Sequence, residues 1–192
     1  MAIVYGRPGT QKPNLPKGSR GYRGNKGEQK VLEKLKELDD SFNILCNVRL
    51  GSYLFSQRST KRTAQIDFVI ISRRGIISLE VKNWSDKYYA EHKKYGYPSP
   101  HLQAEKIGRK LWTDLHFYPC NMERPPVSKV LLSTYGIFQQ DPNFPFVNVK
   151  NMNNINNFLQ NQTEKLSEDA VNHIVEYLMR FVPYGKYDFR YK

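Results

Sequence analysis

The 192-residue chain has little of what marks a membrane, secreted or zinc-binding protein. It has no run of about 18 apolar residues, the length that a membrane-spanning helix needs, and its first ten residues lack the apolar segment of a secretory signal. Its two cysteines, Cys46 and Cys120, are too few for a disulfide framework, and its four histidines have no partners at zinc-ligand spacing. These absences predict a cytoplasmic protein without a membrane partner.

Acidic residues are also scarce. The chain has 18 Asp and Glu against 30 Lys and Arg, which gives a formal net charge of +12 and a pI of about 9.6. Such a balance favours polyanionic partners through counterion release and long-range attraction. It does not by itself distinguish a nucleic acid from an anionic membrane. The length is sufficient for one domain with a sizeable core.

Acids are missing altogether from the first 26 residues, which carry six of the positive charges. These charges belong to Arg7, Lys12, Lys17, Arg20, Arg23 and Lys26. Glycine and proline interrupt the segment repeatedly, and it has too few apolar residues to bury a core of its own. We therefore predict a flexible basic arm over residues 1–26, followed by a domain over residues 27–192. The arm either tethers the protein to a phosphate backbone or is a passive solvated tail.

One stretch concentrates the chemistry, residues 63–84 (TAQIDFVIISRRGIISLEVKNW). Two apolar runs flank a basic turn that contains a glycine, which predicts a β-hairpin. The only two acids, Asp67 and Glu80, lie on opposite arms. A two-residue turn at residues 73–74 places Asp67 opposite Glu80, and a turn shifted by one residue places it opposite Lys82.

Strand side chains alternate with period 2, so both registers gather the polar residues on one face of the hairpin. Those residues are Gln65, Asp67, Glu80 and Lys82. The other face is then entirely apolar and consists of Ile66, Phe68, Ile70, Ile77, Leu79 and Val81.

Two carboxylates in one partly buried place need compensation, because like charges repel and buried ions lose their hydration. A divalent cation between Asp67 and Glu80 would remove both penalties, and Mg²⁺ prefers such oxygen ligands. Lys82 could then stabilise negative charge on a phosphate. The simpler interpretation is a structural salt bridge between Lys82 and one acid, which leaves the other carboxylate uncompensated.

An aspartate on one strand and Glu-x-Lys on the next resembles the PD-(D/E)xK, or restriction-endonuclease-like, nuclease superfamily. The closer resemblance is to its nuclease-related domain (NERD) branch, through Gly27-Glu28, QID at residues 65–67, GII at residues 75–77, EVKNW at residues 80–84 and Gln103. It spans roughly residues 24 to 135. Ile66 stands before the aspartate where the superfamily name has proline, as is usual in this branch.

The resemblance implies an α/β fold with a restriction-endonuclease-like core, in which a mixed central β-sheet is flanked by helices on both faces. It implies a metal-dependent nuclease that hydrolyses phosphodiester bonds, with DNA as the expected substrate. Asp67, Glu80 and the Val81 carbonyl would hold Mg²⁺ or Mn²⁺. Two alternatives stay open, a non-catalytic nucleic-acid-binding module with the same fold and a scaffold protein with an acidic partner. A homodimer is also compatible with the sequence.

Two further residues are placed at the site by the resemblance. Glu28 opens the first predicted helix, whose apolar stripe is Val31, Leu32, Leu35 and Leu38. It either stabilises the helix dipole or is a third acid that contacts a metal-bound water. Gln103 begins the inward face of a helix predicted from His101 to about Phe117. It either orients a water or phosphate oxygen or is a helix-start amide bonded to a loop.

Two other stretches are candidates for contacts with nucleic acid. Arg58, Lys61 and Arg62 precede the Asp67 strand, where they either position phosphates or belong to a solvated loop. Residues 87–97 interleave aromatic residues with cations, which could stack bases and hold phosphates. For that stretch we predict instead a short edge hairpin with half-buried tyrosines.

The remaining pattern predicts a buried strand at residues 127–133, a short strand at residues 146–149 and a terminal helix. The helix begins after Ser167 as its N-cap and ends before Pro183.

Overall fold

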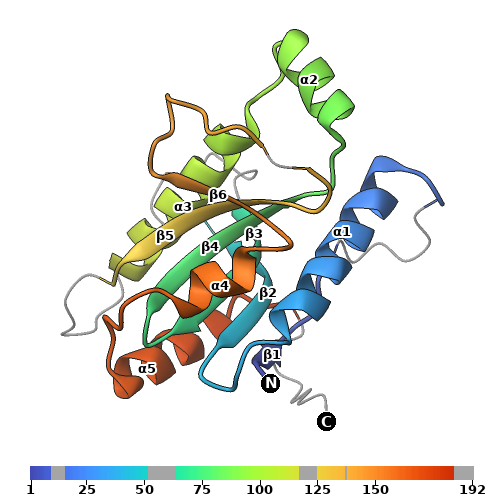
Figure 1. Cartoon of the computed structure of the whole chain (residues 1–192). Helices are drawn as coiled ribbons and strands as arrows, with labels where there is room; N and C mark the ends of the chain where they lie inside the picture. Colours follow the sequence, from blue (N-terminus) through green and yellow to red (C-terminus); the bar gives the residue numbers. More distant parts are fainter. Residues whose placement is uncertain (10–15, 52–63, 117–124, 137, 184–192) are drawn as a thin grey trace.

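The computed structural model describes residues 1–9, 16–51, 64–116, 125–136 and 138–183. Within these ranges the chain forms a six-stranded sheet in the order β1-β2-β3-β4-β5-β6 (Figure 1). Strands β2, β3 and β4 form an antiparallel meander, whereas β1–β2, β4–β5 and β5–β6 are parallel pairs. The strands are β1 Ile3–Tyr5, β2 Asn43–Leu50, β3 Ala64–Ser72, β4 Gly75–Lys82, β5 Val127–Ser133 and β6 Val147–Asn151.

Helices cover both faces of this mixed sheet (Figure 1). They are α1 Arg20–Leu35, α2 Asp86–Lys94, α3 Pro100–His116, α4 Ile155–Gln160 and α5 Glu168–Met179. Apolar residues of α1 and α4 share one core cluster, and those of α3 and α5 share another on the opposite face. The predicted α/β core with helices on both faces is confirmed. No helix in the described ranges is both long and apolar enough to cross a bilayer.

The first helix has its expected apolar stripe but a different start. All four stripe residues are buried, down to Leu38 in the turn that follows the helix. The helix begins at Arg20 because Ser19 caps it, with the Ser19 hydroxyl accepting a hydrogen bond from the Tyr22 amide at 3.2 Å. Glu28 therefore lies two turns inside α1, and the interpretation of it as a first-turn carboxylate is wrong.

The opposite core forms where α3 and α5 pack on the sheet. Ile107 and Leu111 of α3 and Val171 and Ile174 of α5 are buried there. Ser167 caps α5 by accepting a hydrogen bond from the Ala170 amide at 3.2 Å, as predicted. Strand β5 also has its predicted bounds, and β6 begins one residue later than predicted.

Strands β3 and β4 form the predicted hairpin in the first of its two registers. Ser72 lies opposite Gly75, so residues 73–74 form the two-residue turn. The ladder continues through Ile70 opposite Ile77 to Phe68 opposite Leu79. This register places Asp67 opposite Glu80, one step beyond the last pair of the ladder.

The expected alternation along β3 fails at Asp67. Phe68 packs in the core beneath α1, whereas Ile66, expected on the same face, packs in the core beneath α3 and α5. The side chains of β2 switch from one core to the other at the same level, since Cys46 packs beneath α1 and Val48 beneath α3 and α5. The pairing of β2 with β3 nevertheless keeps one register. The residue between Cys46 and Val48, Asn47, has a φ of +60°. This left-handed conformation interrupts the pleat, which is why a strict period of 2 mispredicts Ile66.

The prediction of a flexible arm over residues 1–26 differs from the structure at both of its ends. Ile3–Tyr5 is strand β1, parallel to the start of β2, and Ala2 is buried. Residues 20–26 are the first turns of α1. Composition could not show that the edge of β2 offers backbone partners to this segment. Residues 10–15 lie outside the described ranges.

The edge hairpin predicted over residues 87–97 is also wrong, since most of this stretch is helix α2. Tyr88 and His92, four residues apart, have ring centroids 6.0 Å apart, and both rings contact Trp84. Tyr89 packs on the buried Phe138, with centroids 4.7 Å apart. These contacts at helical spacing favour a helix over a hairpin.

Candidate active site

The open end of the β3–β4 hairpin holds the predicted site residues. Beyond Phe68 and Leu79 the ladder stops, and the Asp67 side chain takes the place of a backbone partner. Its Oδ2 accepts a hydrogen bond from the Val81 amide at 2.8 Å. The Asp67 carboxylate is thus held between the two strands, opposite Glu80.

Lys82 connects β4 to α3. Its Nζ donates a hydrogen bond to Glu80 Oε1 at 2.6 Å and another to Gln103 Oε1 at 2.9 Å. The Glu80 side chain is 3% exposed and the Lys82 side chain 13%. Gln103 itself is exposed, so its predicted place on the inward face of the helix is wrong. It reaches the site because the first turn of α3 lies beside the end of β4.

Glu28 reaches the same region from α1. Its Oε2 accepts a hydrogen bond from the Gly9 amide at 2.6 Å. The Gly9 carbonyl in turn accepts one from Asn47 Nδ2 at 2.9 Å. Gly9 therefore links Glu28 on α1 to Asn47, the left-handed residue of β2 that lies beside Asp67 in the sheet.

Burial raises the pKa of all three carboxyl groups. Burial raises the pKa of Asp67 well above its ordinary value, and the Glu80 and Glu28 carboxylates raise it further. The Val81 amide and the Lys82 ammonium oppose this rise. Burial likewise raises the pKa of Glu28, against the Gly9 hydrogen bond, and of Glu80, against Lys82. Without a cation, ionisation of these carboxyl groups is therefore harder in the folded protein than in water.

The residues present fit a hard divalent cation. Glu80 Oε2 is buried, and no described residue donates a hydrogen bond to it. A buried carboxylate oxygen without a partner is costly unless something positive meets it. In the described part of the chain, no three His, Cys, Asp or Glu side chains form a metal-holding group. An ion would have to rest on Asp67, Glu80, the Val81 carbonyl and water, which is a common arrangement for Mg²⁺.

Sequence reasoning missed the residues that pack α1 against the end of β4. Asn83 Nδ2 donates a hydrogen bond to the Arg23 carbonyl at 2.5 Å, and the Thr134 hydroxyl donates to Asn83 Oδ1. A Cβ on Gly27 would lie 2.5 Å from the Asn83 Cβ, so only glycine fits there. The signal available in the sequence was that Gly27 and Asn83 belong to two of the motifs that carry the family resemblance, Gly27-Glu28 and EVKNW at residues 80–84. Nothing in the sequence pointed to Gly9 or Asn47.

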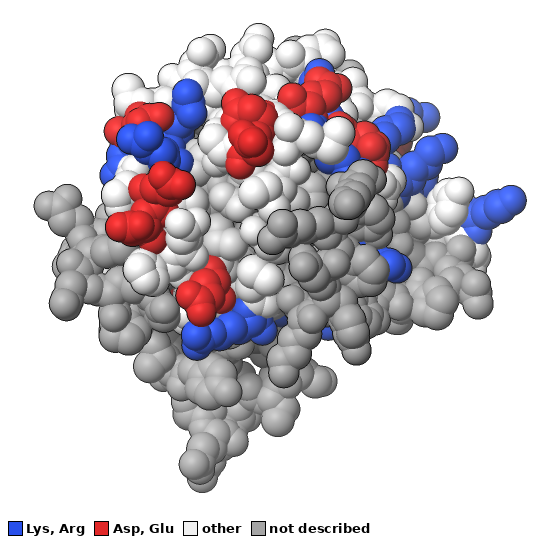
Figure 2. All heavy atoms as spheres, turned by 90° about the horizontal axis from the view of Figure 1, so that it is seen from below, with Lys and Arg blue, Asp and Glu red and all other residues white. Residues whose placement is uncertain are grey.

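The predicted phosphate contacts of Arg58, Lys61 and Arg62 lie outside the described ranges. The face seen from below in Figure 2 shows acidic and basic side chains interspersed over its described part. Among the described residues of that face, the excess of positive charge is therefore not concentrated in one patch.

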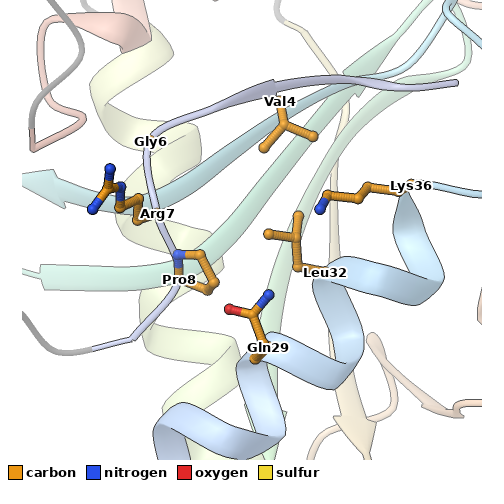
Figure 3. Close-up of a pocket in the computed structure, with 7 residues that line it drawn as sticks. All are labelled: Val4, Gly6, Arg7, Pro8, Gln29, Leu32 and Lys36. Atoms are coloured by element: carbon orange, nitrogen blue, oxygen red, sulfur yellow. The ribbon is translucent and has the colours of Figure 1, made fainter. Parts of the chain in front are cut away.

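A separate pocket of about 380 Å³ lies between the N-terminal segment and α1 (Figure 3). Val4, Gly6 and Pro8 form one side and Gln29, Leu32 and Lys36 the other, while the Arg7 side chain points away from the helix. None of the predicted site residues lines it.

Comparison with protein families gives one match. A family model described as nuclease-related domain matches residues 23–138, a span that includes Glu28, Asp67, Glu80, Lys82 and Gln103. No curated protein and no solved structure matches the chain. The N-terminal segment with Gly9 lies outside the matched residues.

Proposed function

This chain belongs to the nuclease-related domain family, and we propose that it is a Mg²⁺- or Mn²⁺-dependent nuclease that hydrolyses phosphodiester bonds in DNA. The observation that carries the proposal is the buried Glu80 Oε2, to which no described residue donates a hydrogen bond. It lies opposite Asp67, a carboxyl group whose pKa is raised. A structural salt bridge explains the contact between Glu80 Oε1 and Lys82. It leaves the second Glu80 oxygen without a hydrogen-bond donor among the described residues and does not offset the raised pKa of Asp67.

The residues have distinct roles in this proposal. Asp67, Glu80 and the Val81 carbonyl hold the cation. When bound, the cation supplies Lewis acidity and neutralises charge at the scissile phosphate. Lys82, held by Glu80 and Gln103, places its ammonium where it can stabilise the charge that develops on the phosphate oxygens.

Charge explains why activity would require a metal. Fully ionised, the Glu28, Asp67 and Glu80 carboxylates and the Lys82 ammonium sum to a formal charge of −2. A phosphodiester would be repelled from such a site. A divalent cation brings the sum to zero, and the surrounding basic protein then attracts the nucleic acid.

The test is incubation of the purified protein with supercoiled DNA in Mg²⁺, in Mn²⁺ and in EDTA. Asp67→Asn protein, purified identically, is the control for contaminating nucleases. We expect nicked or linear DNA only with metal and only with the wild-type protein. An RNA substrate in parallel tests the assignment to DNA. Salt-dependent binding without any cleavage of either polymer would instead establish the binding-module alternative.

A further inference from the structure

A chain of aromatic rings leads away from the candidate active site. Lys82 Nζ lies 5.5 Å from the centroid of the Trp84 ring. The Trp84 ring is 4.5 Å from that of His92, His92 is 5.0 Å from Tyr97, and Tyr97 is 6.4 Å from Tyr95. We call Trp84, His92, Tyr97 and Tyr95 the aromatic array.

The far end of the array is open to solvent. Tyr95 is 68% exposed and Tyr97 is 58% exposed, whereas Trp84 and His92 are partly buried. The core does not require these outer rings, because the inward packing of this region is made by Tyr89 on Phe138. Exposed aromatic rings that continue a row of ring contacts from within the protein form a surface on which another flat ring can lie.

The array lies beside the end of β4. Figure 1 shows α2, which carries His92 and lies between Trp84 and Tyr95 in the chain, projecting beyond the sheet at the end where β4 finishes. Near the same strand end, Tyr135 is 65% exposed and its ring lies 4.9 Å from Lys30 Nζ. Its neighbour Thr134 donates its backbone N–H to the Lys82 carbonyl at 3.1 Å. A second exposed aromatic ring, with a lysine beside it, thus lies near the strand end that carries Lys82.

Stacking on such rings requires a base with a free face. In duplex DNA both faces of each base are covered by neighbouring base pairs, whereas a single strand can turn its bases onto aromatic side chains. Lys87 and Lys94 are exposed on α2 and carry charge complementary to the phosphates of a strand that lies along the array. A passive aromatic surface would not need to begin at the lysine of the candidate active site.

From this geometry we infer that the aromatic array binds unpaired bases of single-stranded DNA, so that the strand offered to the active site is single-stranded. The inference rests on the proposed function for the nature of the reaction. The binding it describes is independent of cleavage and can be measured without metal.

The experiment measures binding in EDTA by fluorescence anisotropy. The probes are an end-labelled oligothymidylate of about 12 nucleotides, the same length of abasic backbone, the matching duplex and the corresponding RNA. The abasic strand keeps the phosphate charge and removes the bases. We expect the oligothymidylate to bind at least about fivefold more tightly than the abasic strand, because each stacked base contributes about 1–3 kcal/mol. Tighter binding of the RNA or of the duplex would overturn the assignment.

Two variants test the rings directly. Tyr97→Ala should lose about fivefold or more in affinity for the oligothymidylate with little change for the abasic strand, whereas Tyr97→Phe keeps the ring and should retain affinity. Trp112→Ala, which removes an exposed aromatic residue of α3, is the matched control. In a Trp112→Phe background Trp84 is the only tryptophan, and we expect its fluorescence to be quenched by the oligothymidylate but not by the abasic strand.

The results of the binding and cleavage experiments distinguish the role of the aromatic array from the proposed nuclease activity. Tyr97-dependent binding of single strands by a protein that cuts nothing would retain the array and reject the nuclease. Metal-dependent cleavage by a protein that binds abasic and normal strands equally, with or without Tyr97, would retain the nuclease and reject the array.

Discussion

The two ends of one hairpin differ in what they contribute. At the turn end, Ile70 lies opposite Ile77 and Ile71 opposite Ile76, and all four are buried in a continuous ladder. At the open end the ladder stops, and two acids face each other where the sheet would otherwise continue. The turn end has the composition that stabilises a sheet. The open end has a composition that destabilises one unless a cation is bound.

The difference is also visible in the backbone and in the neighbouring strand. Asn47 has its left-handed conformation beside the open end, and the side chains of β2 and β3 exchange faces there. Asn47 Oδ1 is buried and receives no hydrogen bond from the described residues. Irregular backbone and unpaired polar atoms gathered in one place are typical of functional sites. The hairpin therefore has a regular, rigid end and an irregular end, where the left-handed residue of β2 adjoins it.

The largest effect should come from removing the lysine at the open end. Lys82→Ala should reduce metal-dependent cleavage by about 10²–10⁴-fold, because it removes a positioned charge at the phosphate. DNA binding should change by no more than a few-fold, since Lys82 is one of 30 basic residues. Nicking assays and anisotropy measure the two quantities. Lys106→Ala, at an exposed position of α3, is the control. Equal cleavage by Lys82→Ala and wild type would assign the activity to another site.

Substitutions at the turn end should change the stability of the protein. Ile71→Ala should lower the free energy of unfolding by about 2–5 kcal/mol, because it leaves a cavity among fully buried side chains. Ile71→Val should lower it by only about 0.5–1.5 kcal/mol. Urea denaturation measures both values. A loss of cleavage by folded Ile71→Val protein would contradict the separation of the two ends.

At the open end, Asp67→Asn should have the opposite effect and raise the stability of the metal-free protein. Asp67→Asn removes a carboxylate that Glu80 and Glu28 repel, and the Asn oxygen can still accept the Val81 hydrogen bond. In EDTA above neutral pH we expect the melting temperature to rise by a few degrees, equivalent to about 1 kcal/mol for a chain of this size. Asp40→Asn, at an exposed position, should have no such effect. A destabilised Asp67→Asn protein would show that the acid serves the fold.

The raised pKa values also predict a pH dependence. A carboxyl group whose pKa is higher in the folded state stabilises the fold below its unfolded pKa, and this stabilisation is lost as pH rises through the folded pKa. These three groups should therefore contribute less stability to the metal-free protein as pH rises above about 4, the ordinary carboxyl range. Mg²⁺ should restore more stability at higher pH and should release protons on binding. Calorimetry in buffers of different ionisation enthalpy measures this release, and a pH-independent effect of Mg²⁺ would argue against a cation site at Asp67 and Glu80.

The smallest effect should come from the N-terminal connection behind the open end. Asn47→Ala loses the hydrogen bond to Gly9 and places alanine in a left-handed conformation, which together should cost about 1–3 kcal/mol. Asn47→Gly loses only the hydrogen bond and should cost about 1 kcal/mol. If Gly9 holds Glu28 in place, both variants should slow cleavage several-fold relative to a substitution at exposed Asp40. Unchanged rates would limit the connection to a structural role.

Much of the hairpin was predictable because its information is local. The run of β-branched residues, the two-residue turn and the spacing of Asp67, Glu80 and Lys82 lie within 22 residues. The same holds for β5 and for α5 with its Ser167 cap. The predicted alternation along β3 failed only at Asp67. The cause is the left-handed residue Asn47, which lies in the neighbouring strand β2 and is distant in the sequence.

The sequence by itself determined the family resemblance, the hairpin and the set of polar residues at its open end. Tertiary structure decided how that end is completed. It placed Glu28 two turns inside α1, joined it to Gly9 of a segment that composition describes as a basic tail, and turned residues 86–94 into a helix whose rings continue from Lys82. The physical reason is the range of the interactions. Periodicity and turn chemistry act over a few residues, whereas the edge of β2, the Gly9 hydrogen bonds and the ring contacts join segments that are distant in the chain.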